Sequence, residues 1–421
     1  MMARREGRRW IYEWNAGRGA PRPGRRVEVN DETLRDGLQS PSVVHPPLEA
    51  KCEILHLMAE LGIESANIGY PGAGPRALED VVRLAQEVGR ARLPIHPNCA
   101  GRTAEADITP IAEAQDRSGV AIDAALFIGS SPIRQYAEGW ALDFLRRTTE
   151  QAVTLARRLG LEVMFVTEDT TRARPAHLRA LYTTAIECGA RRICLADTVG
   201  YATPWGVRRL VRFMRRVVDG TGEEVKIDWH GHRDRGLDLI NSLAAIEAGA
   251  DRVHACALGI GERVGNTPMD LLLVNLKLLG WRDADLSALP RYCETVARAV
   301  GLPIPCNYPV VGKDAFETST GVHAAAILKA FRKGHHWLAN RVYSGVPAEE
   351  VGRQQVISVG PMSGQANVIC WLQRRGIEPV PRLVEAILDA AKASDRVLRD
   401  EEILSVILEQ ISPVPQGGVS A

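Results

Sequence analysis

The sequence predicts an α/β fold, a (β/α)8 TIM barrel with an appended C-terminal helical region. Short β-rich runs alternate eight times with longer amphipathic segments from residue 27 onward. Several amphipathic segments end in glycine directly before the next β-rich run, as in "ELGI" and "EAGA", which is typical of a helix C-cap. Eight such units in about 250 residues match a barrel. A doubly wound sheet is the alternative, but a glycine-rich phosphate loop usually follows its first strand, and "ETLRDGLQS" follows here.

We expect the eight strands where apolar and β-branched residues cluster in short runs. These runs are residues 27–31, 64–70, 93–97, 121–128, 161–167, 192–196, 225–230 and 252–258. The segments between them, such as "LEAKCEILHLMAELG", repeat apolar residues at helical spacing, which predicts amphipathic helices. The chain is therefore divided into a basic N-terminal arm (1–26), the barrel (27–285) and C-terminal helical subdomains (286–421).

The composition excludes several classes of partner. Lys and Arg number 52, and Asp and Glu number 51. This charge balance predicts that the protein binds neither nucleic acid nor an anionic membrane surface. No run approaches the ~18 apolar residues of a membrane span. The eight cysteines are scattered without a C-x-x-C motif, which predicts reduced thiols. We expect a soluble, cytoplasmic protein whose Arg-rich N-terminal arm lacks the apolar segment of a secretory signal.

Two motifs predict a metal site at one end of the barrel. His230 and His232 end the seventh expected strand, and residues at i and i+2 of a strand point the same way. Arg35 and Asp36 follow the first strand, which barrel closure brings close to the seventh, and chemistry in this fold sits at the carboxyl ends of the strands. Two imidazoles and one carboxylate suit a divalent cation such as Mg, Mn or Zn. The plainer alternative is hydrogen-bonded histidines at a strand end.

The same motifs carry a family resemblance. "DETLRDGLQSP", "ADTVGYATP", "HGHRDRGLDLINSLAAIEAGAD" and "GIGERVGN" resemble the DRE-TIM metallolyase superfamily, and within it the 2-isopropylmalate, homocitrate and citramalate synthase branch. The resemblance runs from about residue 27 to about residue 375. It implies a divalent-metal enzyme that condenses acetyl-CoA with a 2-oxo acid and then hydrolyses the thioester.

The resemblance also implies roles for the residues of the barrel motifs. Asp36, His230 and His232 match the metal ligands, and Asn266 matches a residue that completes or supports the coordination. A turn-forming asparagine is the alternative for Asn266. Arg35 matches the arginine that stabilises the developing alkoxide, the alternative being a structural ion pair with Asp36.

Further residues are assigned by the same resemblance. Thr198 is expected to bind the substrate carboxylate, Glu168 to belong to the proton-handling network, and Gln39 to contact substrate. For Thr198 and Glu168, a helix N-cap or first-turn role is the alternative. Beyond the barrel, "GKDAFETSTGVHAAAILK" places His323 on the general-base position, and "RVYSGVPAEEVGR" places Tyr343 on its partner tyrosine. The alternative for His323 is an ordinary surface histidine.

Departures from the family pattern bear on the substrate. Leu38, Asn67, Thr318 and Arg134 replace residues usual in the synthases. Met164 stands where homocitrate synthases have an arginine, which favours an apolar 2-oxo acid and 2-isopropylmalate-like activity. Arg134, expected beside the fourth strand, favours instead a second carboxylate and a citrate-forming enzyme, and a citramalate-forming enzyme is a further alternative.

Three other functions are weighed and disfavoured. An aldol-cleaving HMG-CoA lyase would carry a cysteine in the loop after the eighth strand, and "ALGIGERVGNT" has none. A biotin-dependent carboxyltransferase would need a lysine on the active face, and a non-catalytic metal-binding barrel would not need Arg35, His323 and Tyr343 together. The resemblance further implies a homodimer with composite active sites, in which the C-terminal subdomains contribute the base and the dimer contacts.

Overall fold

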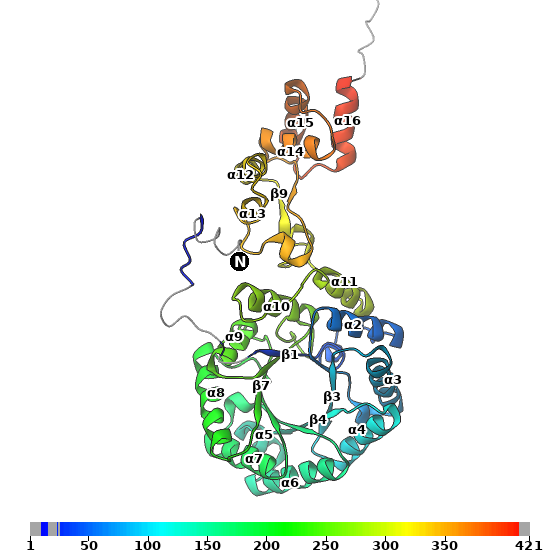
Figure 1. Cartoon of the computed structure of the whole chain (residues 1–421), viewed down its shortest axis with the longest axis vertical. Helices are drawn as coiled ribbons and strands as arrows, with labels where there is room; N and C mark the ends of the chain where they lie inside the picture. Colours follow the sequence, from blue (N-terminus) through cyan, green and yellow to red (C-terminus); the bar gives the residue numbers. More distant parts are fainter. Residues whose placement is uncertain (1–9, 16–22, 24–25, 412–421) are drawn as a thin grey trace, which may run out of the picture. The chain divides into compact units, whose positions relative to one another are not determined.

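The computed structural model describes residues 10–15, 23 and 26–411, so most of the predicted N-terminal arm lies outside the described residues (Figure 1). The chain divides into two compact units: the first extends from Trp14 to Ile304, and the second begins at Pro305 and also includes the described residues 10–13. In the first unit, eight parallel strands form a closed barrel in the order β1 to β8. The predicted (β/α)8 barrel is therefore confirmed.

Each strand of the barrel overlaps its predicted run, but the third is shifted along the chain and the second and eighth are shorter than expected. Their bounds are β1 (Glu28–Asp31), β2 (Ser65–Asn67), β3 (His96–Arg102), β4 (Asp123–Gly129), β5 (Val163–Glu168), β6 (Arg192–Asp197), β7 (Lys226–Gly231) and β8 (Arg252–Ala255). The third strand was expected at 93–97, where the residues are apolar, but it begins at His96. It continues through polar Asn98, whose Nδ2 donates to Asn30 Oδ1 at 2.7 Å and so pairs the buried amide inside the barrel.

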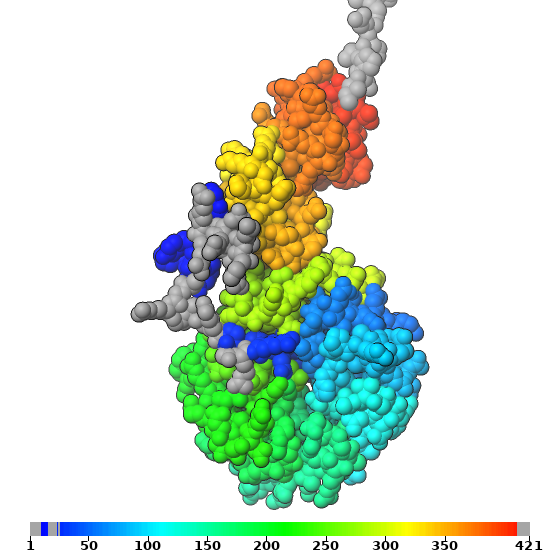
Figure 2. All heavy atoms as spheres, viewed as in Figure 1, coloured from blue at the N-terminus to red at the C-terminus, as the bar shows by residue number. Residues whose placement is uncertain are grey.

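Ten helices of the described residues belong to this unit and cover the outside of the barrel (Figure 1). They are α2 (Leu48–Glu60), α3 (Pro75–Ala91), α4 (Glu105–Ser118), α5 (Pro132–Glu138), α6 (Leu142–Arg158), α7 (Pro175–Glu187), α8 (Pro204–Asp219), α9 (Asp238–Ala248), α10 (Met269–Leu278) and α11 (Leu289–Val300). Outward side chains of the strands, such as Phe165 and Trp229, are fully buried beneath them. In the space-filling view, side chains and loops cover most of the centre that the ribbon leaves open (Figure 2).

Helix α11 groups with the barrel, although the sequence analysis assigned residues from 286 onward to the C-terminal region. The hydroxyl of Tyr292 on α11 donates to Asp31 Oδ2 at 2.5 Å and lies 3.1 Å from Thr33 Oγ1, both directly at the end of β1. These contacts join segments about 260 residues apart. An amphipathic pattern predicts such a helix but does not reveal the body against which its apolar face packs.

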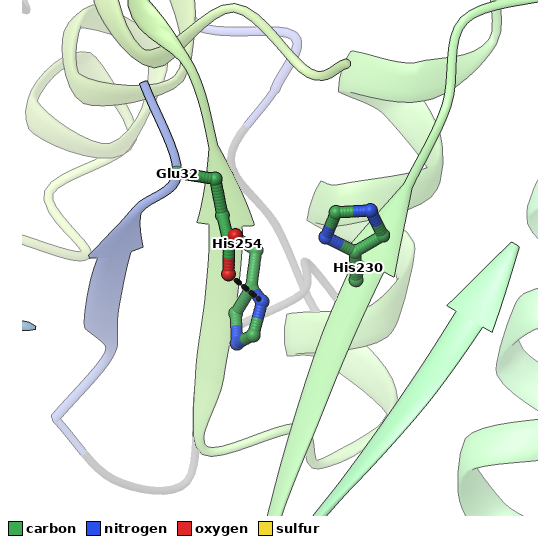
Figure 3. Close-up of side chains that lie close together, drawn as sticks. All are labelled: Glu32, His230 and His254. Carbon is green, nitrogen blue, oxygen red and sulfur yellow. Dashed lines mark ion pairs between the residues drawn. The ribbon is translucent and has the colours of Figure 1, made fainter. Parts of the chain in front are cut away.

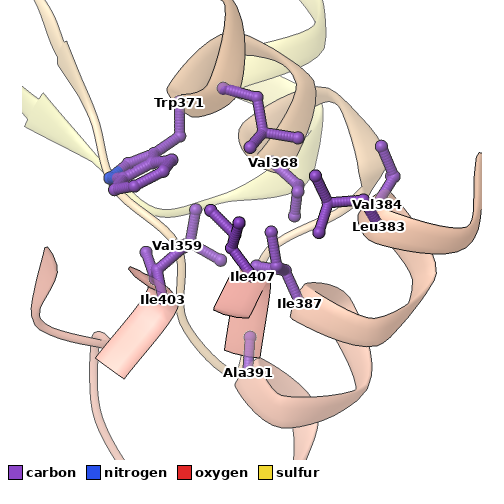
Figure 4. Packing of buried hydrophobic residues seen from close by; sticks show 10 residues of the cluster. Val359, Val368, Trp371, Leu383, Val384, Ile387, Ala391, Ile403 and Ile407 are labelled. Carbon is purple, nitrogen blue, oxygen red and sulfur yellow. The ribbon is translucent and has the colours of Figure 1, made fainter. Parts of the chain in front are cut away.

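The second unit is mainly helical. It contains α12 (Gly321–Arg332), α13 (His336–Ala339), α14 (Gln365–Arg374), α15 (Pro381–Ala393) and α16 (Asp400–Ile411), with a short parallel pair formed by β9 (Glu317–Thr318) and β10 (Val356–Ile357). Helices α14, α15 and α16 enclose an apolar cluster that includes Trp371, Ile387 and Ile407 (Figure 4). No helix among the described residues combines the length and the apolar character that crossing a membrane requires.

Candidate active site

The inner face of the barrel is polar near its carboxyl end. Strand alternation turns Asn30 and Glu32 inward from β1, and both are fully buried. Asn30 Oδ1 accepts hydrogen bonds from Ser65 Oγ of β2 and Asn98 Nδ2 of β3, each at 2.7 Å. The first three strands are therefore joined through inward polar side chains, and the site lies above this layer.

Asp36, His230 and His232 converge as predicted. Asp36 lies five residues after the end of β1, His230 is in β7, and His232 follows β7 directly. Asp36 Oδ2 lies 3.5 Å from His230 Nε2 and 3.8 Å from His232 Nε2, and the two imidazole nitrogens are 3.2 Å apart. All three residues are buried. Three ligand atoms therefore face one point, which is the arrangement that a divalent cation requires.

The loop after β8 fixes the carboxylate of Asp36. Asn266 Nδ2 donates to Asp36 Oδ1 at 2.8 Å, and the backbone N–H of Glu262 donates to the same oxygen at 3.3 Å. Gly261 has φ +151°, and a Cβ there would lie 2.9 Å from Asp36 Oδ1 and only 2.1 Å from Asn266 Nδ2. Glycine is required at this position, because any side chain would push the loop away from the carboxylate.

The protonation states suit a metal. Burial alone would raise the pKa of Asp36, but Arg35 and the two histidines outweigh it and hold that pKa well below its ordinary value. Burial and the neighbouring His230 lower the pKa of His232 to about 4, so its ring is neutral at neutral pH. Asn266 Oδ1 is buried without a hydrogen-bond partner among the described residues. An anionic carboxylate, a neutral imidazole and an unpaired amide oxygen fit a divalent cation.

Arg35 lies beside this group with its guanidinium held on two sides. Nη1 donates to Asp36 Oδ2 at 3.2 Å and to Gln39 Oε1 at 3.3 Å, and Nε donates to Glu32 Oε2 at 3.0 Å. Nη2 also donates to Glu32. The contact with Gln39 places this predicted substrate residue at the rim of the same site.

Glu168 and Thr198 lie at the carboxyl ends of the neighbouring strands β5 and β6. Thr198 Oγ1 accepts a hydrogen bond from the backbone N–H of Asp169, the residue after Glu168, at 2.8 Å. Burial raises the pKa of Glu168, and the nearby Arg134 opposes that shift. A carboxyl group with a raised pKa is suited to proton transfer, and the role expected for Glu168 stays a prediction.

The two residues that bear on the oxo acid lie in different settings. Met164 is buried inside the barrel near the start of β5, and its Sδ accepts a hydrogen bond from Arg252 Nη2 at 3.3 Å. Val166 lies between Met164 and Glu168 on the same face of β5, so this face is apolar below Glu168. Arg134 lies in α5, after β4, where it pairs with Glu138 at 2.7 Å.

His323 and Tyr343 both belong to the second unit, where they come together. Their rings are stacked, with centroids 3.8 Å apart and planes inclined by 25°. His323 lies in the first turn of α12, and Tyr343 is 49% exposed. Two residues that the sequence analysis assigned together as base and partner are thus in direct contact.

A buried charged group beside the metal ligands was missed by the sequence analysis. His254 of β8 lies between Glu32 and Asp228, and its ring faces His230 at 5.6 Å between centroids (Figure 3). Glu32 lies in the quoted motif "DETLRDGLQSP", and His254 lies in the expected eighth strand, residues 252–258. The i, i+2 alternation from Asn30 to Glu32 would have placed the glutamate inside the barrel.

Known proteins resemble this chain over most of its length. The family model described as HMGL-like matches residues 26–296. The homocitrate synthase AksA of Methanopyrus kandleri is 34% identical over 392 residues, 91% of this chain and 93% of that protein. The probable 2-isopropylmalate synthase of the same organism is 32% identical over 373 residues, 87% of this chain and 69% of that protein. An HMG-CoA lyase structure from Bacillus subtilis covers 68% of this chain and 97% of its own, with a TM-score of 0.56 at 18% identity, which shows a shared fold.

Proposed function

The chain belongs to the HMGL-like family, and on that premise we propose that it is an acyltransferase that condenses acetyl-CoA with a 2-oxo acid. The observation that carries this proposal is the convergence of Asp36, His230 and His232 beside the guanidinium of Arg35. The similarity to proteins named homocitrate synthase and 2-isopropylmalate synthase supports condensation over cleavage.

Each residue has a defined task in this reaction. A divalent cation held by Asp36, His230 and His232 would supply Lewis-acid chemistry at the 2-oxo group. His323 accepts a proton from the acetyl methyl group, and the resulting carbanion forms a bond to the 2-oxo carbon of the acid. The electron pair of the C=O bond moves to oxygen, where Arg35 stabilises the negative charge before that oxygen takes up a proton. Water then adds to the thioester, the C–S bond breaks, and CoA leaves as the thiol.

For the 2-oxo acid, we propose an apolar side chain, as in 2-isopropylmalate synthesis. The inward face of β5 is apolar at Val166 and Met164, and an apolar surface does not compensate the desolvation of a second carboxylate. Arg134 supports the second candidate, a dicarboxylic oxo acid such as oxaloacetate, although its charge is already paired with Glu138.

The test measures CoA release from acetyl-CoA with 2-oxoisovalerate, pyruvate, oxaloacetate and 2-oxoglutarate, each with Mg, Mn or Zn. We expect the highest kcat/KM with 2-oxoisovalerate. A preference for oxaloacetate or 2-oxoglutarate would overturn the apolar assignment while leaving the reaction class intact. CoA release with none of the four acids would contradict the condensation itself.

We further propose a homodimer with composite active sites. His323 and Tyr343 belong to one unit of the chain and the metal ligands to the other, so catalysis requires residues of both units to meet. A two-fold dimer satisfies this requirement reciprocally in both subunits. Mixing His323→Ala with Asp36→Ala under conditions of subunit exchange should restore up to about a quarter of wild-type activity. Demonstrated exchange without recovery would place the base and the metal ligands of one site in the same chain.

A further inference from the structure

A second group of potential ligands lies directly beside the first. Atoms of Glu32, His230 and His254 all lie within 4.8 Å of one another, and all three residues are buried. His230 belongs to both groups, and Figure 3 shows it facing the pair formed by Glu32 and His254. This second group could therefore either bind a cation or serve the first group in another way.

The hydrogen bonds of His254 argue against a metal ligand. Its Nδ1 lies 3.1 Å from Glu32 Oε1, and its Nε2 lies 2.9 Å from Asp228 Oδ2. A ring with a carboxylate at each nitrogen donates from both and offers no lone pair to a cation. Burial would lower the pKa of His254, but Asp228 and Glu32 outweigh it and raise that pKa. Both ring nitrogens of His254 are therefore committed to carboxylates, and the raised pKa favours the protonated ring.

Glu32 is likewise committed through both of its oxygens. Oε1 accepts from Asn30 Nδ2 at 2.8 Å and faces His254, while Oε2 accepts from Nε and Nη2 of Arg35. Asp228 is in turn held by Arg252 Nε at 2.7 Å and Arg192 Nη1 at 2.6 Å. A continuous series of charge-assisted bonds thus runs from the middle of the barrel to the guanidinium beside the metal ligands.

Arg35 has two carboxylate neighbours, and they have different tasks. Asp36 contacts only Nη1, at 3.2 Å, and its Oδ2 also faces the two histidines of the metal group. Glu32 contacts both Nε and Nη2, which fixes the plane of the guanidinium. When Asp36 binds a cation, Glu32 is the remaining carboxylate that holds Arg35 in place.

We infer that Glu32, anchored by His254 and Asp228, is a positioning residue that holds the guanidinium of Arg35 toward the 2-oxo group of the substrate. The inference rests on the proposed function. Because outer residues of this kind tune a site without touching substrate, Glu32→Gln should lower kcat by about 10- to 100-fold and change KM little. His254→Gln should have a smaller effect of the same kind, since it acts through Glu32.

The test combines kinetics with metal analysis. Glu32→Gln and Glu32→Asp are compared with Glu28→Gln, a matched variant of the same inner face of β1 whose carboxylate pairs with Lys226 and Arg192 instead. Elemental analysis after dialysis against Mn or Zn should show unchanged metal content in all three variants. Loss of one equivalent of metal in both Glu32 variants, but not in Glu28→Gln, would make the second group a metal site and overturn the inference.

A double-mutant cycle separates positioning from a general structural role. In the Arg35→Gln background, Glu32→Gln should cost less than about 3-fold, because the group that it positions is gone. An equal loss of kcat in both backgrounds, or a kcat for Glu32→Gln equal to wild type, would overturn the inference. Should Glu32→Gln fail to fold by circular dichroism, Glu32→Asp, which keeps the charge but shortens its reach, replaces it in the cycle. If wild-type protein releases no CoA, the proposed function itself is contradicted. The outcomes above concern only the variants and test only the role of Glu32.

Discussion

At the centre of the barrel, Asp228, Arg252 and His254 are each at most 3% exposed, and their ionic groups contact one another. In the second unit, Val368 and Ile387 are equally buried, but they pack only among apolar side chains in the cluster of Figure 4. Burying charges costs desolvation that their mutual attraction roughly offsets, whereas burying apolar area stabilises directly.

The difference shows where each region gains its stability. The barrel draws its stability from the apolar layer between strands and helices, where Phe165, Trp229 and Val253 are fully buried. Its charged centre contributes orientation rather than net stability. The apolar cluster of the second unit has no such task, and its packing holds the helices that follow His323 and Tyr343 in the chain.

The largest expected effect comes from the charged region. Asp36→Asn removes an anionic ligand, so we expect activity to fall on the order of 10³-fold and metal content to fall with it. CoA release and elemental analysis after exhaustive dialysis measure the two quantities. Asp123→Asn is the control, because that carboxylate lies at the first residue of β4, the end of the strand opposite to the site, and should leave both unchanged. Full turnover by metal-free protein would contradict the assignment of a metal site to Asp36, His230 and His232.

The apolar region should respond in stability rather than in metal binding. Ile387→Ala leaves a cavity in the cluster and should lower the free energy of unfolding of that unit by about 2–5 kcal/mol. Hydrogen exchange in α14 and α15 localises the effect. Leu404→Ala, at a site 43% exposed and outside the cluster, should change stability by less than about 0.5 kcal/mol. Equal effects of the two variants would contradict the packing described for this unit.

The smallest expected difference between the two regions is the loss of folding stability at acidic pH. Burial raises the pKa of Glu32, but Arg35 and His254 outweigh it and lower that pKa to about 2 from its ordinary 4.5. A carboxyl group whose pKa is lowered by folding stabilises the folded state at pH values above its pKa in the unfolded chain. This stability is lost as the pH falls toward 2. Between pH 6 and pH 3 the barrel should lose about 2 kcal/mol through Glu32 alone. The side chains of the apolar cluster do not titrate, and the carboxylates beside it, Asp400 and Glu402, lie near the surface, where solvent screening weakens their contribution to stability. Hydrogen exchange at both pH values measures each unit separately. A larger acid loss in the helices around Ile387 would reverse the comparison.

Much of the fold could be read from local patterns. The eight β-rich runs and the glycine-terminated helices predicted the barrel, and seven strands lie where expected. The third strand was misplaced because its inward Asn98 breaks the apolar pattern, and only contact with Asn30 and Ser65 makes an amide acceptable there. The eighth was expected to run to 258 but ends at Ala255, where the chain enters a turn that leads to the loop whose Glu262 and Asn266 contact Asp36.

Part of the candidate site could also be predicted, because some of its residues lie in short local motifs. The H-x-H and Arg-Asp motifs are short enough to be recognised within one strand end, so Asp36, His230 and His232 were named correctly as neighbours. The group formed by Glu32, His254 and Asp228 was not, because each of these residues alone is an ordinary polar residue near a strand end. They form a charged group only because the folded barrel brings together three separate parts of the chain.

The sequence by itself determined the period of each element and the chemistry available at each strand end. Side-chain alternation and helical spacing are local properties, set by backbone geometry over a few residues. Only the tertiary structure decided which of these groups meet. Barrel closure brings Asn266 to Asp36 across 230 residues of chain, and it sets His254 between two carboxylates from different strands. Such contacts depend on strand register and on the packing of the whole barrel, and no stretch of neighbouring residues encodes them.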